Sequence, residues 1–418
     1  MKIAFFSDCY LDLTGGITSS INAQKAELER RGHTVYVFSS SFPKSEKEIS
    51  KLAKNNIFPV PSCKIFFRGF TPVSRRPNII EKWLMRTHPE LESFDVFYIH
   101  YESGCSIAGL RLAKQLGIPS IQVMHGREDM GEQNIIPYGL RTLVAANLNW
   151  FHSWYIPHRV TIKRDDYLAN KLAGAKMWTL MVNHANAADL VLTPSNHFRE
   201  KLLHYGVKKP IKVLPNGVLD SYFVKDLPSR SLEEGEELKI IWHSRMSAEK
   251  RMMPFLKAIA RVKPKYHLDV YGGGGDYFRA KRFARHHKLN VTFHGNKDFA
   301  TIYRKILTSH LDVLVSYNFD TFGLTLIEAE SAGTPVLFVD PDMEEIVPKG
   351  SFVLADTPGS DSIAKAIDYL IDHPSQIPKM SACMLEHRDE VRVSKRMDEL
   401  ERIIAELSKD RADKVHKT

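Results

Sequence analysis

One stretch, residues 311–339, constrains the fold of this chain more than any other. It begins with an apolar run, Leu311 to Val315, that indicates a buried parallel strand. After a polar loop come the helical pattern Leu324 to Ala332, Gly333 as a helix end, and a second apolar run, Thr334 to Val339. Strand, loop, helix and strand in this order predict an α/β fold with a parallel sheet.

Two carboxylates stand eight positions apart in this stretch. Asp320 lies in the loop at the carboxyl end of the first strand, and Glu328 lies one turn into the helix. Ligands of open α/β sheets bind at that edge, so these carboxylates can take the hydroxyls of a sugar and a ribose. The backbone N–H groups that open the helix can hold a phosphate; they belong to Phe322, Gly323, Leu324 and Thr325.

The motif D-T-F-G-L-T-L-I-E-A resembles the E-x7-E motif of the retaining family-four glycosyltransferases, which have the GT-B fold. In that family the first acid usually touches the donor sugar and the second touches the nucleotide ribose. The resemblance implies these roles for Asp320 and Glu328, with the shorter Asp in place of the first Glu. The alternative is a plain βαβ unit with two solvated acids, because a fold does not imply a function.

Composition sets the broad class. A chain of 418 residues favours two domains, and no run of about 18 apolar residues predicts a transmembrane helix. Met1 to Phe6 reads as a strand rather than a signal peptide. The cysteines lack metal-binding spacing and indicate free thiols in a reducing cytosol; they are Cys9, Cys63, Cys105 and Cys383.

Positive charge is concentrated in the first half of the chain. Residues 1–217 hold 28 Lys and Arg against 18 Asp and Glu, whereas the remainder holds 30 against 31. This asymmetry suggests an anionic surface or ligand on the N-terminal side, with a membrane or nucleic acid as candidates. No nucleic-acid recognition fold is evident, so we expect no nucleic-acid partner.

The first half also carries two candidate binding features. Gly15 and Gly16 follow the first strand, where they let the backbone approach a ligand, and they match the family's L-x-G-G-I loop at the donor phosphates and acceptor. His125 follows a later strand, and lipid-modifying members of the family have a His at the matching place. A histidine there can hold a sugar hydroxyl or steady a developing charge. The alternatives are an ordinary glycine turn and a histidine satisfied by backbone.

The second half carries a pair of cations. Arg245 ends an apolar strand and Lys250 follows five residues later, where both can neutralise a diphosphate leaving group. The family has G-R-x-x-x-E-K here, and this chain keeps Arg245, Glu249 and Lys250 with Ser244 in place of the Gly. The alternative is a surface basic pair. Because these cations can do a metal's work and no D-x-D motif is evident, we expect no metal and no cofactor.

Residues 140–178 combine aromatic and basic side chains, a composition that suits helices lying on an anionic bilayer. Pro157 interrupts the segment, so two helices are expected rather than one. The alternative is a helix pair packed on the first domain with solvated charges. The candidate membrane residues are Trp150, Trp154, Arg159, Lys163 and Arg164.

The resemblance implies two Rossmann-like domains facing a central cleft. We assign residues 1–217 to an acceptor-side domain, with a C-terminal helix at 390–418 crossing back to it, and residues 218–389 to a nucleotide-sugar domain. The implied activity is retaining hexosyl transfer, with UDP-glucose, the family's commonest donor, as the expected substrate. In this scheme Arg245 and Lys250 hold the diphosphate, Glu328 holds the ribose, and Asp320 and His125 hold the sugar.

The acceptor is less constrained than the donor. His125, the basic first half and the aromatic segment give a likeness to bacterial enzymes that glucosylate diacylglycerol, which implies a cytoplasmic, peripheral membrane enzyme making a glycolipid. A soluble, cell-wall or exopolysaccharide glycan acceptor is the alternative within the same enzyme class. A non-catalytic nucleotide-sugar-binding scaffold is a more remote alternative, against which the intact Arg, Lys and acid set argues.

Overall fold

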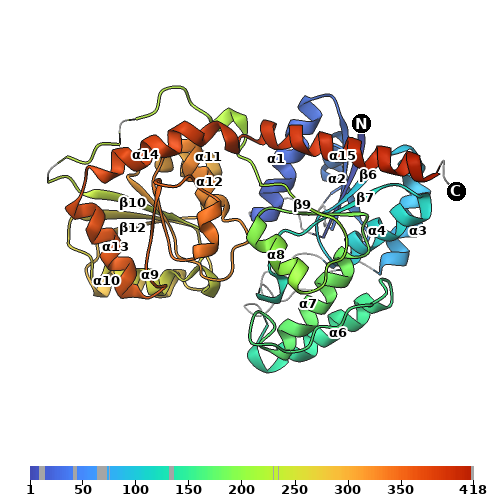
Figure 1. Ribbon diagram of the computed structural model, residues 1–418, viewed down its shortest axis with the longest axis horizontal. Coiled ribbons are helices and arrows are strands. Elements are labelled where there is room, and N and C mark those ends of the chain that lie inside the picture. The colour runs from blue at the N-terminus through green and yellow to red at the C-terminus, as the bar shows by residue number, and fades with distance from the viewer. Residues whose placement is uncertain are drawn as a thin grey trace. The chain divides into compact units, whose positions relative to one another are not determined.

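The computed structural model describes residues 1–8, 15–40, 45–63, 73–74, 76–130, 136–228, 230–233 and 235–415. The chain divides into an N-terminal unit, residues Met1–Pro215 with Arg396–Thr418, and a C-terminal unit, residues Asn216–Lys395. Each unit is a parallel β-sheet covered by helices (Figure 1). The two Rossmann-like domains expected from the sequence are therefore confirmed.

The N-terminal unit is built on a seven-stranded sheet in the order β3-β2-β1-β6-β7-β8-β9, with neighbouring strands parallel. Its central strands are apolar because both faces are covered, and five of the six residues of β1 are buried. The strands are β1 Lys2–Ser7, β2 Thr34–Ser40, β3 Ile57–Val60, β6 Val96–Ile99, β7 Ser120–Val123, β8 Leu190–Thr193 and β9 Ile211–Val213. A separate antiparallel pair joins β4 Ser62–Cys63 to β5 Val73–Ser74.

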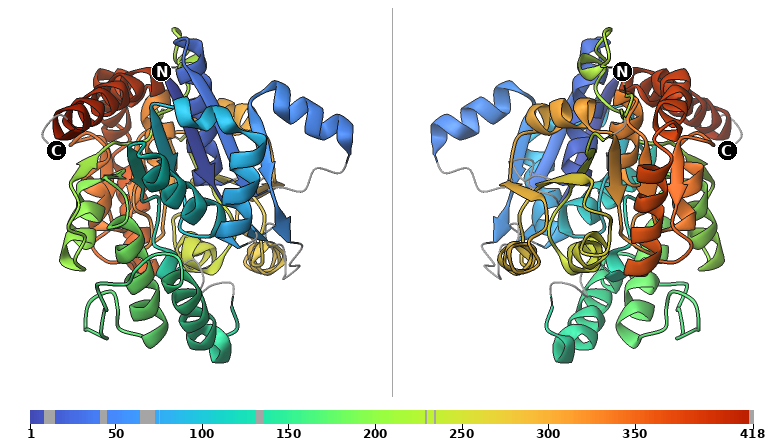
Figure 2. Two further views of the ribbon diagram at one scale, coloured as in Figure 1. Left: turned by 90° about the vertical axis from the view of Figure 1, so that its right-hand side faces the viewer. Right: turned by 90° about the vertical axis from the view of Figure 1, so that its left-hand side faces the viewer.

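The helices of the N-terminal unit are α1 Gly16–Arg30, α2 Glu46–Lys54, α3 Pro77–Thr87, α4 Gly104–Leu116, α6 Arg141–Ser153, α7 Leu172–Ala185 and α8 Asn196–His204. The prediction of two helices around Pro157 is confirmed, because α6 ends before this proline and α7 begins after it. These two helices pack against each other and lie at the lower end of the N-terminal unit in both views of Figure 2.

The C-terminal unit has a six-stranded sheet in the order β12-β11-β10-β13-β14-β15. Its strands are β10 Leu238–His243, β11 Tyr266–Tyr271, β12 Val291–Gly295, β13 Leu311–Leu314, β14 Val336–Phe338 and β15 Phe352–Leu354. They are also parallel, and the order corresponds to 3-2-1-4-5-6 along the chain. In this order the direction of winding reverses between β10 and β13, which is where doubly wound sheets bind ligands.

The helices of the C-terminal unit are α9 Met252–Ile259, α10 Tyr277–His286, α11 Phe299–Thr308, α12 Leu324–Ala332, α13 Ser360–Asp372 and α14 Gln376–His387. The bounds predicted for α12 are confirmed. Gly333 ends this helix in the left-handed conformation with φ of +70°, which a side chain rarely adopts. The apolar run after it becomes β14, so the βαβ unit predicted from residues 311–339 is present.

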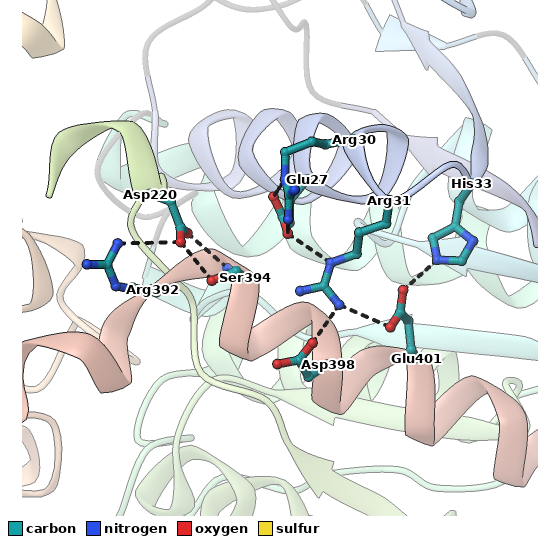
Figure 3. A network of polar contacts seen from close by, with 9 residues as sticks. All are labelled: Glu27, Arg30, Arg31, His33, Asp220, Arg392, Ser394, Asp398 and Glu401. Carbon is teal, nitrogen blue, oxygen red and sulfur yellow. Dashed lines mark hydrogen bonds and ion pairs between the residues drawn. The ribbon is translucent and has the colours of Figure 1, made fainter.

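The last helix, α15 Val393–Val415, begins in the C-terminal unit and continues into the N-terminal unit. At its start the backbone of Val393 donates to Val218 O over 2.8 Å, and Asp220 accepts from the Ser394 backbone and hydroxyl (Figure 3). Further along, Asp398 and Glu401 of α15 both bind Arg31, which follows α1. The first three turns of the helix are thereby held by contacts within the C-terminal unit at Ser394 and within the N-terminal unit at Asp398 and Glu401.

Candidate active site

Adjacent strands bring the predicted donor-site residues of the C-terminal unit to one edge of its sheet. β10 pairs with β13, so the segments that follow these strands emerge side by side. Arg245 follows β10, and Asp320 lies in the loop after β13 that leads into α12. This is the carboxyl edge at the point where the winding reverses, as the sequence predicted.

Lys250 and Asp320 form an ion pair across this edge. The Lys250 ammonium lies 2.6 and 2.9 Å from the two carboxylate oxygens of Asp320, and both side chains are largely buried. The Ser316 hydroxyl also donates to Asp320. The structure therefore brings the predicted diphosphate cation and the predicted sugar acid together, and each holds the other in place.

Arg245 is held differently. Its side chain is exposed, while its guanidinium donates to the buried Glu249 over 3.0 Å and to the Ser247 hydroxyl over 3.3 Å. The contact with Glu249 thus fixes the direction in which the long Arg245 side chain points. An exposed guanidinium fixed at one end is suited to reach an anion from solution.

The glycine-rich turn after β11 packs tightly on the backbone around Arg245. Gly272 has φ of +116°, and a Cβ atom on it would lie 1.9 Å from the Ser244 carbonyl oxygen. Gly274 has φ of +146°, and its Cβ would lie 2.5 Å from the Met246 carbonyl oxygen. Only glycine allows this approach, so the turn fixes the backbone that carries Arg245.

The start of α12 is open toward this edge. Gly323 caps the helix in the left-handed conformation with φ of +65°, and the Phe322 side chain is buried against Ile327. The first backbone N–H groups of a helix have no acceptor within the helix, so those of Leu324 and Thr325 are available for an anion.

Glu328 lies behind this opening, in contact with a histidine that the sequence analysis missed. His243, the last residue of β10, lies with Nδ1 3.6 Å from Glu328 Oε2 and with Nε2 2.8 Å from Asp312 Oδ2. Burial raises the pKa of Glu328 to about 7, although the neighbouring His243 lowers it. A signal existed, because His243 stands two positions before Arg245, but its partner Asp312 is 69 residues away.

In the N-terminal unit, His125 emerges where predicted, after β7; it is half-buried and stacks on the fully buried His100. His125 Nε2 lies 2.9 Å from His100 Nδ1, and the rings are nearly parallel. Burial lowers the pKa of His125 to about 4, and burial together with His125 lowers that of His100. Both rings are therefore neutral near pH 7, and one proton is shared between the two facing nitrogens.

Three acidic groups that the sequence analysis did not select follow strand ends in the same unit, and they act on one another. Asp8, after β1, accepts from the backbone N–H groups of Cys105 and Ser106 at the start of α4. Glu128 accepts from the Tyr101 hydroxyl over 2.9 Å. Burial, with Glu128 and Asp8 nearby, raises the pKa of Glu102 well above its usual value. These residues follow strand ends, the same signal that identified His125.

The remaining predicted residues lie at two places in the N-terminal unit. Gly15 and Gly16 open α1 as expected, and the part of their loop at 9–14 is outside the described residues. Exposed apolar side chains lie on α6 and at its C-terminal cap: Leu143, Trp150 and Trp154 are 63, 56 and 53% exposed. The exposed cations Arg159, Lys163 and Arg164 follow this helix.

Two other features are absent from the described parts of the chain. No helix there is long and apolar enough to cross a membrane. No group of three or more His, Cys, Asp and Glu side chains among the described residues is arranged to hold a metal ion.

Two models of known protein families match the chain. The model of Glycosyltransferase Family 4 matches residues 14–222, half of the chain. The chain belongs to this family. The model of Glycosyl transferases group 1 matches residues 224–384, so the two matches cover most of both units. The family 4 chain is thus a glycosyltransferase of the hexosyltransferase type, as the sequence analysis implied.

Two relatives of this family 4 glycosyltransferase carry the same name, alpha-monoglucosyldiacylglycerol synthase. The one from Streptococcus pneumoniae (strain ATCC BAA-255 / R6) is 25% identical over 81% of this chain and 70% of its own length. The one from Acholeplasma laidlawii is 22% identical over 81% of this chain and 80% of its own length. Other relatives, whose names give lipopolysaccharide, peptide or poly(glycerol-phosphate) acceptors, match over 26 to 38% of the chain.

Solved structures confirm the GT-B fold. Anabaena Alr3699/HepE in complex with UDP and glucose has a TM-score of 0.69 at 15% identity, over 97% of this chain and 100% of that chain. An identity this low shows the fold alone. The roles given above to the individual site residues of the family 4 glycosyltransferase therefore stay predictions.

Proposed function

We propose that this glycosyltransferase moves glucose from UDP-glucose to diacylglycerol with retention, making an alpha-linked glycolipid at an anionic membrane surface. The observation that carries the proposal is the Lys250–Asp320 ion pair at the winding reversal of the C-terminal sheet, the edge at which α12 also presents Glu328. Support for the donor comes from a fold neighbour solved with UDP and glucose. Support for the acceptor comes from the two diacylglycerol-glucosylating relatives.

On the donor side, the cations neutralise the charge that forms on the diphosphate as the sugar leaves. Lys250 is partly neutralised by Asp320, so the incoming diphosphate and sugar compete for both members of this pair. Arg245 reaches the diphosphate from solution, and the open start of α12 adds backbone donors. The Glu328 carboxylate accepts hydrogen bonds from the ribose hydroxyls. The departing phosphate itself takes the proton of the acceptor hydroxyl.

On the acceptor side, His125 contributes a neutral imidazole. At neutral pH such a ring can donate to or accept from a sugar hydroxyl without bringing a net charge. The exposed apolar side chains of α6 and its cap, together with the cations that follow, suit an anionic bilayer, because aromatic side chains insert at the headgroup level while cations bind lipid phosphates. The enzyme is thus proposed to bind the membrane at its periphery.

The first experiment measures UDP release from UDP-glucose by the purified protein, with and without vesicles of diacylglycerol and phosphatidylglycerol. We expect release to rise sharply only when both lipids are present, with formation of one glycolipid. UDP release that is equal with and without vesicles would support UDP-glucose as the donor but reject the lipid acceptor. A screen of soluble and cell-wall glycans would follow.

The membrane surface is tested with the paired variant Trp150→Ser, Trp154→Ser. We expect vesicle binding to fall at least tenfold, since about 1.4 kcal/mol of lost burial corresponds to that factor. Phe278→Ser is the matched control, because Phe278 is an aromatic residue 82% exposed on the C-terminal unit. Equal vesicle binding by the Trp variant and the wild-type protein would reject this surface.

Catalysis without a metal or other cofactor is part of the same proposal. Turnover in excess EDTA is expected to match turnover in added Mg²⁺, because Arg245 and Lys250 supply the positive charge at the diphosphate. A loss of activity with EDTA that Mg²⁺ or Mn²⁺ restores would contradict this.

A further inference from the structure

A buried histidine links the proposed ribose acid to the interior of the C-terminal sheet. We propose that His243 is a positioning residue for the donor: anchored by Asp312, it takes the proton of Glu328 and so keeps that carboxylate ionised for the ribose hydroxyls. The inference rests on the proposed function, since it concerns the ribose of the nucleotide sugar.

Three side chains from three elements form a continuous line. Asp312 of β13 lies 2.8 Å from His243 Nε2, and His243 Nδ1 lies 3.6 Å from Glu328 Oε2 on α12. The side chains of Asp312 and His243 are 2 and 6% exposed, whereas that of Glu328 is 17% exposed. The line therefore begins in the core and ends at the proposed ligand edge.

The geometry fixes which atoms exchange the proton. Asp312 accepts the Nε2 hydrogen of His243, so Nδ1 is the ring atom that faces Glu328. When Glu328 is protonated, Nδ1 is bare and can accept that proton; when the proton transfers, His243 is an imidazolium and Glu328 a carboxylate. One proton moves between two atoms, and no other reactant takes part.

The pKa values of both groups are raised, for identifiable reasons. Burial raises the pKa of Glu328 to about 7. Burial alone lowers the pKa of His243, but the charge and hydrogen bond of Asp312 overcome it, and the pKa of His243 is raised. Other groups interact electrostatically with this pair. The positive charge of Lys250 lowers the pKa of His243, and the phenols of Tyr222 and Tyr303 lie near Glu328.

The charge state of Glu328 matters for ribose recognition. An ionised carboxylate accepts hydrogen bonds from both the 2′ and the 3′ hydroxyl, whereas a protonated one must first find an acceptor for its own hydrogen. Donor affinity should therefore follow the ionisation of Glu328, and His243 should set the pH at which affinity is lost.

The experiment is calorimetric titration of UDP between pH 6 and 9. His243→Gln is the informative variant, because the amide nitrogen of Gln falls near the position of Nε2 and retains the bond to Asp312 while removing the group that faces Glu328. If the substitution raises the pKa of Glu328 by one unit from about 7, the affinity of the variant should converge with that of the wild-type protein at pH 9, be about fivefold weaker at pH 7 and approach tenfold weaker at pH 6. His267→Gln, at the amino end of β11, is the control expected to match the wild-type profile.

A second ligand and a second background exclude a merely structural effect. With 2′,3′-dideoxy-UDP, which lacks both hydroxyls, His243→Gln and the wild-type protein should bind alike at every pH. In a Glu328→Gln background, His243→Gln should cause no further pH-dependent change. Equal weakening of UDP at all pH values, or equal weakening of the dideoxy ligand, overturns the inference.

If the proposed function is wrong, the titrations give a different result from the one expected when only the role of His243 is wrong. ADP and GDP are titrated in parallel with UDP, and the diphosphate that binds tightest is used for the comparison. Absence of binding by all three overturns both the donor site and the role of His243. Binding with identical pH profiles for wild-type protein and His243→Gln overturns the role of His243 alone.

Discussion

The ion pair between Lys250 and Asp320 has a direct consequence for catalysis at the scale of single residues. Lys250→Met is expected to lower kcat/KM for UDP-glucose by about 10² to 10³, because a fixed charge at a leaving group is worth several kcal/mol. The measurement is UDP release at varied donor concentration, and Lys257→Met, on the exposed side of α9, is the control. A loss below threefold would show that Lys250 serves only to hold Asp320.

Gly272 and Gly275 lie in one turn but differ in backbone conformation and in the space around them, and this difference gives a second prediction for single residues. Gly272→Ala should lower the free energy of unfolding by about 2 kcal/mol or more, since it combines a strained φ with a Cβ atom against the Ser244 carbonyl. Gly275→Ala, which has open space and no positive φ, should change it by less than about 1 kcal/mol. Denaturant unfolding of both variants checks this, and equal effects would contradict the packing argument.

Single residues were predictable from sequence where their position in a βα unit defined them. Asp320, Glu328 and Arg245 follow strands or open helices, and chain order alone places them at one edge. The partners of these residues were not predictable, because Lys250 and Asp320 are separated by 70 residues and His243 and Asp312 by 69. When the carboxylate that binds a buried histidine is far away in the sequence, the sequence predicts an ordinary core residue.

At the scale of elements, two buried histidines, His152 and His184, join α6 to α7. His152 of α6 lies 2.7 Å from His158 and 2.9 Å from His184 of α7. Burial lowers the pKa of His184 to about 3 and also lowers the pKa of His152. Below pH 6.5 the unfolded chain binds protons that the folded chain does not, so stability is complete above that pH and is lost as the pH falls.

The expected loss is at most about 1.4 kcal/mol per pH unit for each of these two histidines. Denaturant unfolding at pH 7.5, 6.0 and 5.0 measures it in the wild-type protein and in His184→Gln. The variant should be less stable at pH 7.5 but should lose less stability on acidification, whereas His204→Gln, an exposed control, should follow the wild-type slope. Identical slopes in wild-type protein and His184→Gln would rule out this account.

Elements were predictable to the extent that local pattern fixes them. The bounds of α12 follow from an apolar helical pattern and a glycine at its end, and Pro157 separates α6 from α7. The exposure of Trp150 and Trp154 did not follow, because an aromatic row at helical spacing packs inward as readily as it faces solvent.

At the scale of the molecule, the N-terminal unit depends on a helix from the far end of the chain. Apolar residues of α15 are almost fully buried: Met397, Leu400, Ile403 and Ile404. A chain that stops at Lys395 should lose at least about 4 kcal/mol of N-terminal stability, since each such side chain contributes about 1.5 to 3 kcal/mol. A chain that stops at Ser408 retains these residues and is the control.

Tryptophan emission can follow this effect, because Trp242 is the C-terminal unit's tryptophan and the other four lie in the N-terminal unit. In a Trp242→Phe background the denaturant midpoint should fall for the chain ending at Lys395 and stay unchanged for the chain ending at Ser408. Equal midpoints would mean that α15 adds nothing to the N-terminal unit.

The path of α15 also has a consequence for biosynthesis. The C-terminal unit is one continuous segment, residues 216–395, so a ribosome has synthesised all of it before the last helix exists. Synthesis of the N-terminal unit begins before that of the C-terminal unit but is completed after it, because residues 396–418 follow residue 395 along the chain. The nascent chain therefore carries an uncovered apolar surface throughout translation of the C-terminal unit, and this surface can close only after α15 has been synthesised.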